Sequence, residues 1–304
     1  MLFSDRLATA LEAKKSPVVV GIDPHLDRFP SPLRQLASST DRKLAAAAIQ
    51  RFVDELLEAI ADTVAIVKPQ VAFFERLGPP GWRALEHTVA RAHELGLLVL
   101  ADAKRGDIGS TATAYADYFF GDSGLGADAL TVNAYLGSDS LAPFVSYVTK
   151  GKGLFVLAKT SNPGSKELQD LTLEGSEGTE PVYSQVGHLA DKLGTDSVGE
   201  LGYSSIGLVV GATSPQQAAT LRGQFPRLPF LVPGYGAQGG GAEDVIAAFD
   251  DHGRGAIVNA SRSILFAYAT PEHEDLGPER WAEASRRECI AMRDAIRAAL
   301  AAHR

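Results

Sequence analysis

Acidic and basic residues alternate over the six positions 102–107, directly after an apolar stretch. Asp102, Lys104 and Asp107 follow the run 97–101, Leu-Leu-Val-Leu-Ala. Side chains of a strand alternate between its two faces, so Asp102 and Lys104 point to the same side. A lysine held between two carboxylates stays protonated and places negative charge beside any bound molecule. This spacing predicts a pre-arranged set of charges that acts on a substrate.

Two further charged residues end apolar stretches earlier in the chain. Asp23 and Lys68 each close a short valine-rich run, and each precedes a proline, which favours extended backbone. If these runs are parallel strands of one barrel, their carboxyl ends meet at one mouth. We therefore expect Asp23, Lys68, Asp102 and Lys104 to lie in one pocket.

Two loops in the last third of the chain have the composition of a phosphate site. The first is the glycine-rich run 233–241, and the second is the run 257–263, which contains Arg262. Barrels commonly bind phosphate between their last two loops, against backbone N–H groups. Glycine permits close approach of the backbone, and the planar guanidinium of Arg262 can hold phosphate oxygens. We predict a phosphate-binding site between these loops.

The elements that must position these residues form a regular series. Short, continuously apolar runs, typical of parallel strands covered on both faces, alternate with helical patterns such as 49–60 and 80–94. Eight such units predict a (β/α)8 TIM barrel that forms one domain over 1–304, with a doubly wound sheet as the alternative. The expected strands are 18–23, 64–68, 97–104, 129–135, 154–160, 206–211, 229–234 and 256–260.

The segment 162–180 interrupts this alternation. It is long, polar and glycine-rich, and it follows the fifth expected strand on the side where barrel loops build active sites. Loops of this length commonly act as lids or binding loops, and the alternative is a solvated insertion. We expect an extended loop here.

Composition disfavours several classes of protein. A net charge of −8 argues against general nucleic-acid or membrane binding. No apolar run approaches the roughly 20 residues of a membrane helix, and the early charges in 1–7 do not match a signal peptide. The single cysteine, Cys289, cannot form an internal disulfide, and its helical pattern predicts a packing role. These features predict a cytoplasmic protein.

Metal and cofactor motifs do not stand out in the sequence. The seven histidines are scattered, and the chain lacks a nucleophile elbow, a Walker loop and a dinucleotide fingerprint. The candidate chemistry therefore depends on lysines and aspartates, and we predict no metal and no cofactor.

Together, these segments resemble the orotidine 5'-phosphate decarboxylase family over residues 18–263. The run 102–111, with its Asp-x-Lys-x-x-Asp spacing, matches the family's signature and is similar to its longer bacterial branch. Lys68, in the sequence Val-Lys-Pro, matches the family's lysine on the second strand. The resemblance implies a catalytic tetrad of alternating charge, formed by Lys68, Asp102, Lys104 and Asp107.

The resemblance also implies which residues hold the substrate. Asp23 resembles the aspartate that binds the ribose, and Ser161 resembles the serine that reads the pyrimidine. A further group would close over the phosphate, and others would line the rest of the pocket. The implied set is Asp23 and Ser161, then Pro233, Gln238 and Arg262 at the phosphate, and Ile108, Thr111 and Asn133 elsewhere.

By this resemblance, the chain is a cofactor-independent enzyme that converts orotidine 5'-phosphate to uridine 5'-phosphate, the last step of de novo pyrimidine nucleotide synthesis. The resemblance implies a homodimer in which Asp107 and Thr111 reach the neighbouring site. It also implies that the substrate carboxylate lies near Asp102, and that Lys104 stabilises the carbanion at C6 and protonates it.

Three alternatives stay open on the sequence alone. Related barrels that act on sugar phosphates, such as ketogulonate-phosphate decarboxylase or hexulose-phosphate synthase, share the motif but need a divalent metal and have an acidic residue in place of Lys68. A catalytically silent phosphate-binding barrel would share the Arg262 loop without needing four alternating charges. A Schiff-base aldolase would use Lys104 as a neutral amine, which two flanking carboxylates disfavour.

Overall fold

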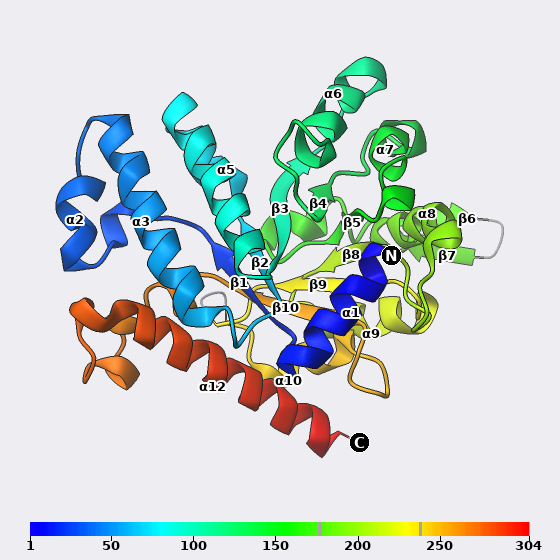
Figure 1. The fold of residues 1–304 in the computed structure, drawn as a ribbon. Coiled ribbons are helices and arrows are strands. Elements are labelled where there is room, and N and C mark those ends of the chain that lie inside the picture. Colours follow the sequence, from blue (N-terminus) through cyan, green and yellow to red (C-terminus); the bar gives the residue numbers. More distant parts are fainter. Residues whose placement is uncertain (176–177, 237–238, 304) are drawn as a thin grey trace.

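A closed barrel of eight parallel strands, surrounded by helices, forms the centre of the molecule (Figure 1). The computed structural model describes residues 1–175, 178–236 and 239–303. Around the barrel the strand order is β1-β10-β9-β8-β5-β4-β3-β2, so the first and second strands in sequence are also neighbours in space. The predicted (β/α)8 TIM barrel is confirmed. The doubly wound alternative is wrong, because the sheet closes on itself.

All eight predicted strands are present as barrel strands. Their ends differ from the predicted limits by a few residues, because the sequence pattern does not show where hydrogen bonding stops. The barrel strands are β1 (Val18–Ile22), β2 (Ile66–Pro69), β3 (Leu98–Arg105), β4 (Ala129–Val132), β5 (Gly153–Lys159), β8 (Ile206–Val210), β9 (Phe230–Pro233) and β10 (Ala256–Ala260).

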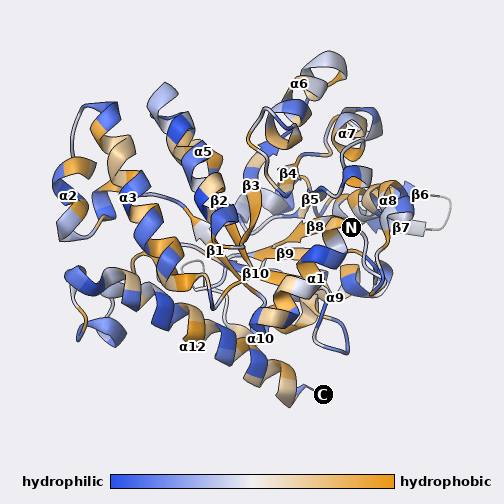
Figure 2. Ribbon diagram, viewed as in Figure 1, coloured by the Kyte–Doolittle hydropathy of each residue, from blue (hydrophilic) through white to orange (hydrophobic). Residues whose placement is uncertain are grey.

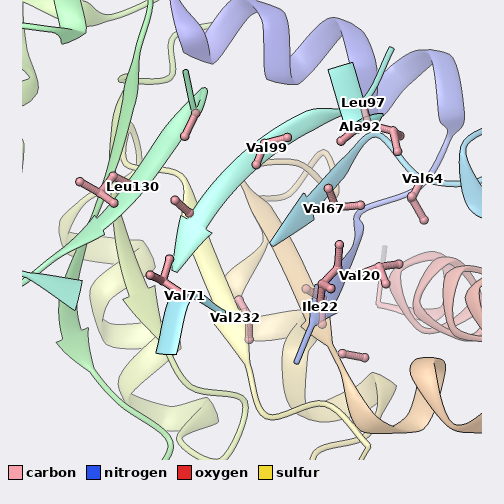
Figure 3. Packing of buried hydrophobic residues seen from close by; sticks show 14 of the residues in the cluster. Val20, Ile22, Val64, Val67, Val71, Ala92, Leu97, Val99, Leu130 and Val232 are labelled. Carbon is pink, nitrogen blue, oxygen red and sulfur yellow. The ribbon is translucent and has the colours of Figure 1, made fainter. Parts of the chain in front are cut away.

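The strands are continuously apolar because both of their faces are buried. Val19 and Leu100 point into the barrel and belong to an inner core, whereas Val67 and Val99 belong to an outer core. Figure 3 shows Val67 and Val99 together with Ala92 of the surrounding helix layer. Two cores of this kind are what a parallel barrel with a helical coat requires.

Helices cover the outside of the barrel, and their hydrophilic residues contrast with the hydrophobic strands in Figure 2. The predicted pattern 49–60 is the second half of α3, and the pattern 80–94 corresponds to α5. The helices are α1 (Phe3–Lys14), α2 (Ser31–Ala37), α3 (Arg42–Ile60), α4 (Val71–Glu75), α5 (Pro79–Glu94), α6 (Gly109–Phe120), α7 (Ser138–Val145), α8 (Val182–Gly194), α9 (Pro215–Gln224), α10 (Ala242–Val245), α11 (Arg262–Leu265) and α12 (Trp281–Ala302).

The packing role predicted for Cys289 agrees with its position on the buried face of α12. Its neighbours on that face, Met292 and Ile296, are also buried. Burial raises the pKa of the Cys289 thiol, so the side chain behaves as a small apolar group. Within the described part of the chain, no helix combines the length and hydropathy needed to cross a membrane.

The first helix closes the end of the barrel at which the strands begin. Phe3 and Leu7 of α1 join the inner core, and the Phe3 ring meets Phe155 edge-on at 6.3 Å between centroids. Gly153, the first residue of β5, makes room for this ring, since a Cβ there would lie 2.2 Å from Phe3 Cδ1. The opposite end, where the strands finish, is therefore left for ligand binding.

The segment 162–180 differs from the extended loop that the sequence predicts. It contains a short 3₁₀ helix, Pro163–Glu167, followed by the antiparallel strands β6 (Thr172–Gly175) and β7 (Gly178–Pro181). These strands give no alternating apolar pattern, because Leu173 is the only large apolar residue in either of them. The sequence therefore did not predict the pairing of β6 with β7.

We expect Phe3→Ala to lower the free energy of unfolding by about 3–5 kcal/mol, because it empties a space in the barrel floor. Urea denaturation would measure the change, with the exposed Leu44→Ala on α3 as a control that changes stability by about 0.5 kcal/mol or less. An equal effect of the two substitutions would contradict the role of α1 as the floor.

Candidate active site

Charged side chains gather in a pocket of about 450 Å³ at the carboxyl ends of the strands. Asp23 follows β1, Lys68 lies on β2, Asp102 and Lys104 lie on β3, and Arg262 follows β10. All five line this one pocket, and the sequence led us to expect four of them there, with Arg262 assigned to a phosphate site. A second cavity of about 550 Å³ lies at the opposite end of the barrel beside α1 and contains none of these residues.

The carboxylate of Asp102 lies between two lysines. Lys68 Nζ is 2.7 Å from its Oδ2, and Lys104 Nζ is 2.6 Å from its Oδ1. Thr131 Oγ1 donates a further hydrogen bond to Oδ1 at 2.9 Å, and Gln70 Nε2 donates one to Oδ2 at 3.0 Å. Four donors therefore hold one carboxylate, and its orientation is fixed before any ligand arrives.

The two lysines differ in exposure. The Lys68 side chain is 4% exposed, whereas the Lys104 side chain is 46% exposed. Lys68 therefore lies beneath the pocket surface, and Lys104 presents its ammonium to the opening. Of the two, Lys104 is placed to meet a bound molecule.

Mutual attraction keeps the buried groups charged. Burial opposes charge on Lys68, but the carboxylates of Asp102 and Asp23 outweigh it and raise the pKa of Lys68 above its usual value. Burial also opposes charge on Asp102, but Lys68 and Lys104 hold its pKa far below the usual range. The lysine stays cationic and the aspartate anionic across neutral pH.

The backbone at Lys104 is strained. Its φ of 49° lies in the left-handed region, which costs a residue with a Cβ about 1–2 kcal/mol. The pairing of β3 with β4 shifts register between Ala101 and Arg105, and the Lys104 amide donates to Thr131 Oγ1 at 2.9 Å. Irregularities of this kind redirect side chains near active sites. The register shift between Ala101 and Arg105 spans Lys104, the lysine that faces the pocket.

The same pocket also offers acceptors for a hydroxylated ligand. Asp23 Oδ1 and Asn259 Oδ1 are buried, and neither accepts a hydrogen bond from the described residues. Buried acceptors are usually satisfied, so this pair suits a ligand that donates hydroxyl groups. Gly21 leaves space beside Asn259, since a Cβ at residue 21 would lie 2.9 Å from Asn259 Oδ1.

The predicted phosphate and pyrimidine residues belong to the same pocket. Ser161, Pro233 and Arg262 line the pocket. Gln238 lies outside the described residues, so its predicted place stays a prediction. Over the ranges that the structure describes, no group of three His, Cys, Asp or Glu side chains is arranged to hold a metal ion.

The remaining predicted residues do not line the pocket of their own chain. Asp107 Oδ1 accepts from the Ile108 amide, and Asn133 Oδ1 accepts from the Tyr135 amide at 3.0 Å. Thr111 is exposed in the first turn of α6. One chain thus assembles three members of the predicted tetrad, and Asp107 lies apart from them.

The pocket also contains polar lining residues that the sequence did not predict, among them Gln70, Thr131, Asn259 and Gln169. Three of them, Gln70, Thr131 and Asn259, lie on or just after barrel strands. They were not predicted because the prediction relied on charged residues at strand ends. Polarity near the end of an apolar run was a signal that could have found them. Gln169 comes from the segment 162–180 and reaches the pocket through folding that no local pattern indicates.

We expect Asp102→Asn to destabilise the fold by about 3–5 kcal/mol at pH 7, because it leaves Lys68 buried without its main counter-ion. The pKa of Lys68 then falls below its unfolded value, so the unfolded chain binds more protons and the loss shrinks as pH rises toward 9.5. Urea denaturation of variant and wild type at both pH values would measure this. The exposed Asp196→Asn serves as control, and an equal loss at both pH values would contradict the argument.

Known proteins resemble this chain over almost its whole length. Residues 16–274 match the sequence profile of the orotidine 5'-phosphate decarboxylase / HUMPS family. Orotidine 5'-phosphate decarboxylase of Rhodopirellula baltica is 44% identical over 304 residues, which cover 98% of this chain and 99% of that protein. The enzyme of the same name from Clostridium perfringens strain 13 is 41% identical over 301 residues, covering 98% and 99%.

A solved structure shares the whole architecture. The Leishmania donovani OMP decarboxylase superimposes with a TM-score of 0.72 at 31% identity, and the match covers 99% of each chain. Profile, sequence and structure comparisons therefore agree along almost the full length. The chain belongs to the orotidine 5'-phosphate decarboxylase / HUMPS family.

Proposed function

We propose that this chain decarboxylates orotidine 5'-phosphate to uridine 5'-phosphate without a cofactor, as a cytoplasmic enzyme with one barrel domain over 1–304. The observation that carries the proposal is the Asp102 carboxylate fixed between Lys68 and Lys104 inside the barrel mouth. Decarboxylation removes a carboxylate from the substrate and leaves negative charge on carbon. The Asp102 carboxylate would repel the substrate carboxylate, and the Lys104 ammonium would stabilise the new charge. The names of the relatives support the same reaction.

Binding energy from the ends of the substrate holds its ring in place. Arg262 and Pro233 would contact the phosphate, Asp23 would accept from ribose hydroxyls, and Ser161 would contact the pyrimidine. These contacts lie away from the reacting carbon, so their energy can position the ring and oppose unfavourable contacts there. We infer that Asn259 assists Asp23, because its buried Oδ1 also lacks a donor among the described residues.

The reacting carboxylate would lie beside Asp102, and the bond between C6 and the carboxyl carbon breaks to release carbon dioxide. The electron pair stays on C6, next to the ammonium of Lys104. Lys104 then transfers a proton to C6 and is reprotonated from water. Because the carboxylate and both ammoniums are already fixed, little reorganisation accompanies the appearance of charge.

The charge of Lys68 favours this chemistry over the metal-dependent reactions of related barrels. Lys68 Nζ lies 2.7 Å from Asp102 Oδ2. The resemblance implies that the metal-dependent barrels have an acidic residue at this position. The Schiff-base alternative is also disfavoured, since Lys104 Nζ donates to Asp102 Oδ1 at 2.6 Å and is not free to attack a carbonyl.

We further propose a homodimer in which Asp107 and Thr111 complete the neighbouring pocket. Both lie outside the pocket of their own chain, although the signature predicts a role for each. Exposed apolar side chains accompany them after β3 and β4, with Ile108, Tyr135 and Leu136 exposed by 57%, 77% and 48%. Such a patch beside an active-site mouth suits a contact between two copies of the chain.

We expect Lys104→Ala to reduce turnover of orotidine 5'-phosphate by at least about 10⁴-fold, because it removes both the proton donor and the charge opposite C6. The fall of substrate absorbance in the presence of EDTA would measure it. Lys166→Ala, at an exposed lysine of the 163–167 helix, is the matched control and should retain full turnover. Near-normal activity of the Lys104 variant would refute the proposed function.

Mixing two inactive variants tests the composite site. Dimers re-formed from equal amounts of Lys104→Ala and Asp107→Ala chains should recover about a quarter of wild-type activity, since half are hybrids with one intact site of two. Turnover after mixing, compared with each variant alone, gives the answer. If Asp107 acts within its own chain, mixing restores no turnover, and the composite site is contradicted.

A further inference from the structure

A buried lysine that the proposed mechanism does not use anchors the segment after β5. Lys159, the last residue of β5, is 1% exposed. Its Nζ donates to Asp170 Oδ1 at 2.6 Å and to Ser165 Oγ at 3.1 Å. A buried ammonium requires such partners, so the end of β5 and the segment 163–170 are held together.

A second contact joins the same two pieces of chain at the pocket. Gln169 Oε1 accepts from the backbone amide of Thr160 at 2.9 Å, and Gln169 Nε2 donates to Thr160 Oγ1 at 2.8 Å. The Gln169 side chain thereby binds both the backbone and the side chain of one residue. Gln169 and Thr160 both line the pocket.

The residue after this pair is Ser161, which is also held from the side of β8. Thr213 Oγ1 donates to the Ser161 carbonyl at 3.2 Å. Gly211 allows the close approach, since a Cβ there would lie 2.8 Å from Ser161 Cα. The Gly211 amide donates to the Lys159 carbonyl at 2.7 Å. Ser161 thus lies between a support from β8 and a support from 163–170.

We infer that Gln169 and Asp170 are positioning residues that fix Ser161 for recognition of the pyrimidine base. Neither acts on the reacting atoms: Gln169 acts through Thr160, and Asp170 acts through Lys159. The segment 163–170 thereby controls the affinity for the base and not for the phosphate. This inference rests on the proposed function, in which Ser161 contacts the pyrimidine.

The position of the phosphate residues makes the inference testable. Pro233 ends β9 and Arg262 follows β10, on strands that are not paired with β5. Loss of the supports at 169 and 170 should therefore leave phosphate binding intact. A purely structural role would instead weaken all ligands together.

Two ligands separate these outcomes: uridine 5'-phosphate, which carries the base, and ribose 5-phosphate, which lacks it. We expect Gln169→Ala and Asp170→Asn to raise the dissociation constant of uridine 5'-phosphate by at least about tenfold. The dissociation constant of ribose 5-phosphate should stay within about twofold of wild type, since its contacts are untouched. Calorimetry or NMR titration measures both.

Two further variants complete the design. Glu167→Gln, at an exposed acid of the same short helix, should leave both affinities unchanged. Asp170→Glu, which keeps the charge, should recover part of the affinity for uridine 5'-phosphate that Asp170→Asn loses. If Asp170→Asn does not fold, Gln169→Ala still tests the inference, because this substitution leaves the ion pair between Lys159 and Asp170 in place.

Equal weakening of both ligands, or no change in either, would overturn the inference while leaving the proposed function intact, provided that the wild-type chain turns over orotidine 5'-phosphate. A wild-type chain that neither decarboxylates this substrate nor binds uridine 5'-phosphate would overturn both. The two failures are therefore distinguishable by the wild-type measurement alone.

Discussion

One carboxylate shared by two ammonium groups is the interaction on which the rest of the pocket depends. Asp102 cannot be buried without Lys68, and Lys68 cannot be buried without Asp102, because each charge alone would be too costly to remove from water. Together they form a buried ion pair beneath the pocket surface. Asp102 of this pair also accepts from Lys104, whose side chain faces the opening. The barrel supplies the rigid strands that this arrangement needs, and its helical coat stabilises those strands.

The pocket is built from two kinds of structure with different tasks. Strand ends supply the charges, because parallel strands bring their carboxyl ends to one place whatever their separation in sequence. Segments after the strands supply contacts of other kinds, such as the Gln169 contact with Thr160. The charges of Lys68, Asp102 and Lys104 are therefore fixed by the barrel strands, whereas the loops around them can differ between proteins without moving these charges.

The sequence predicted the repeated strands of the barrel well, but it did not predict the local structures that occur once. All eight strands followed from apolar runs, and the gathering of Asp23, Lys68, Asp102 and Lys104 followed from the barrel itself. The left-handed backbone at Lys104 left no pattern in sequence. Nor did the paired strands β6 and β7, whose stability comes from backbone contacts and from neighbours distant in the chain. Polar pocket residues without charge were missed because similar residues also occur in ordinary turns.

The helix that closes the barrel floor also constrains the order in which the chain can fold. Phe3 packs against Phe155, and the Ser4 amide donates to Ser205 Oγ across 201 positions of sequence. The inner core that α1 joins also includes Ile257 of β10, so the amino-terminal helix has no complete docking surface until most of the polypeptide has left the ribosome. Docking of this helix is a late, long-range event of folding, and until then the amino-terminal end of the barrel interior stays uncovered.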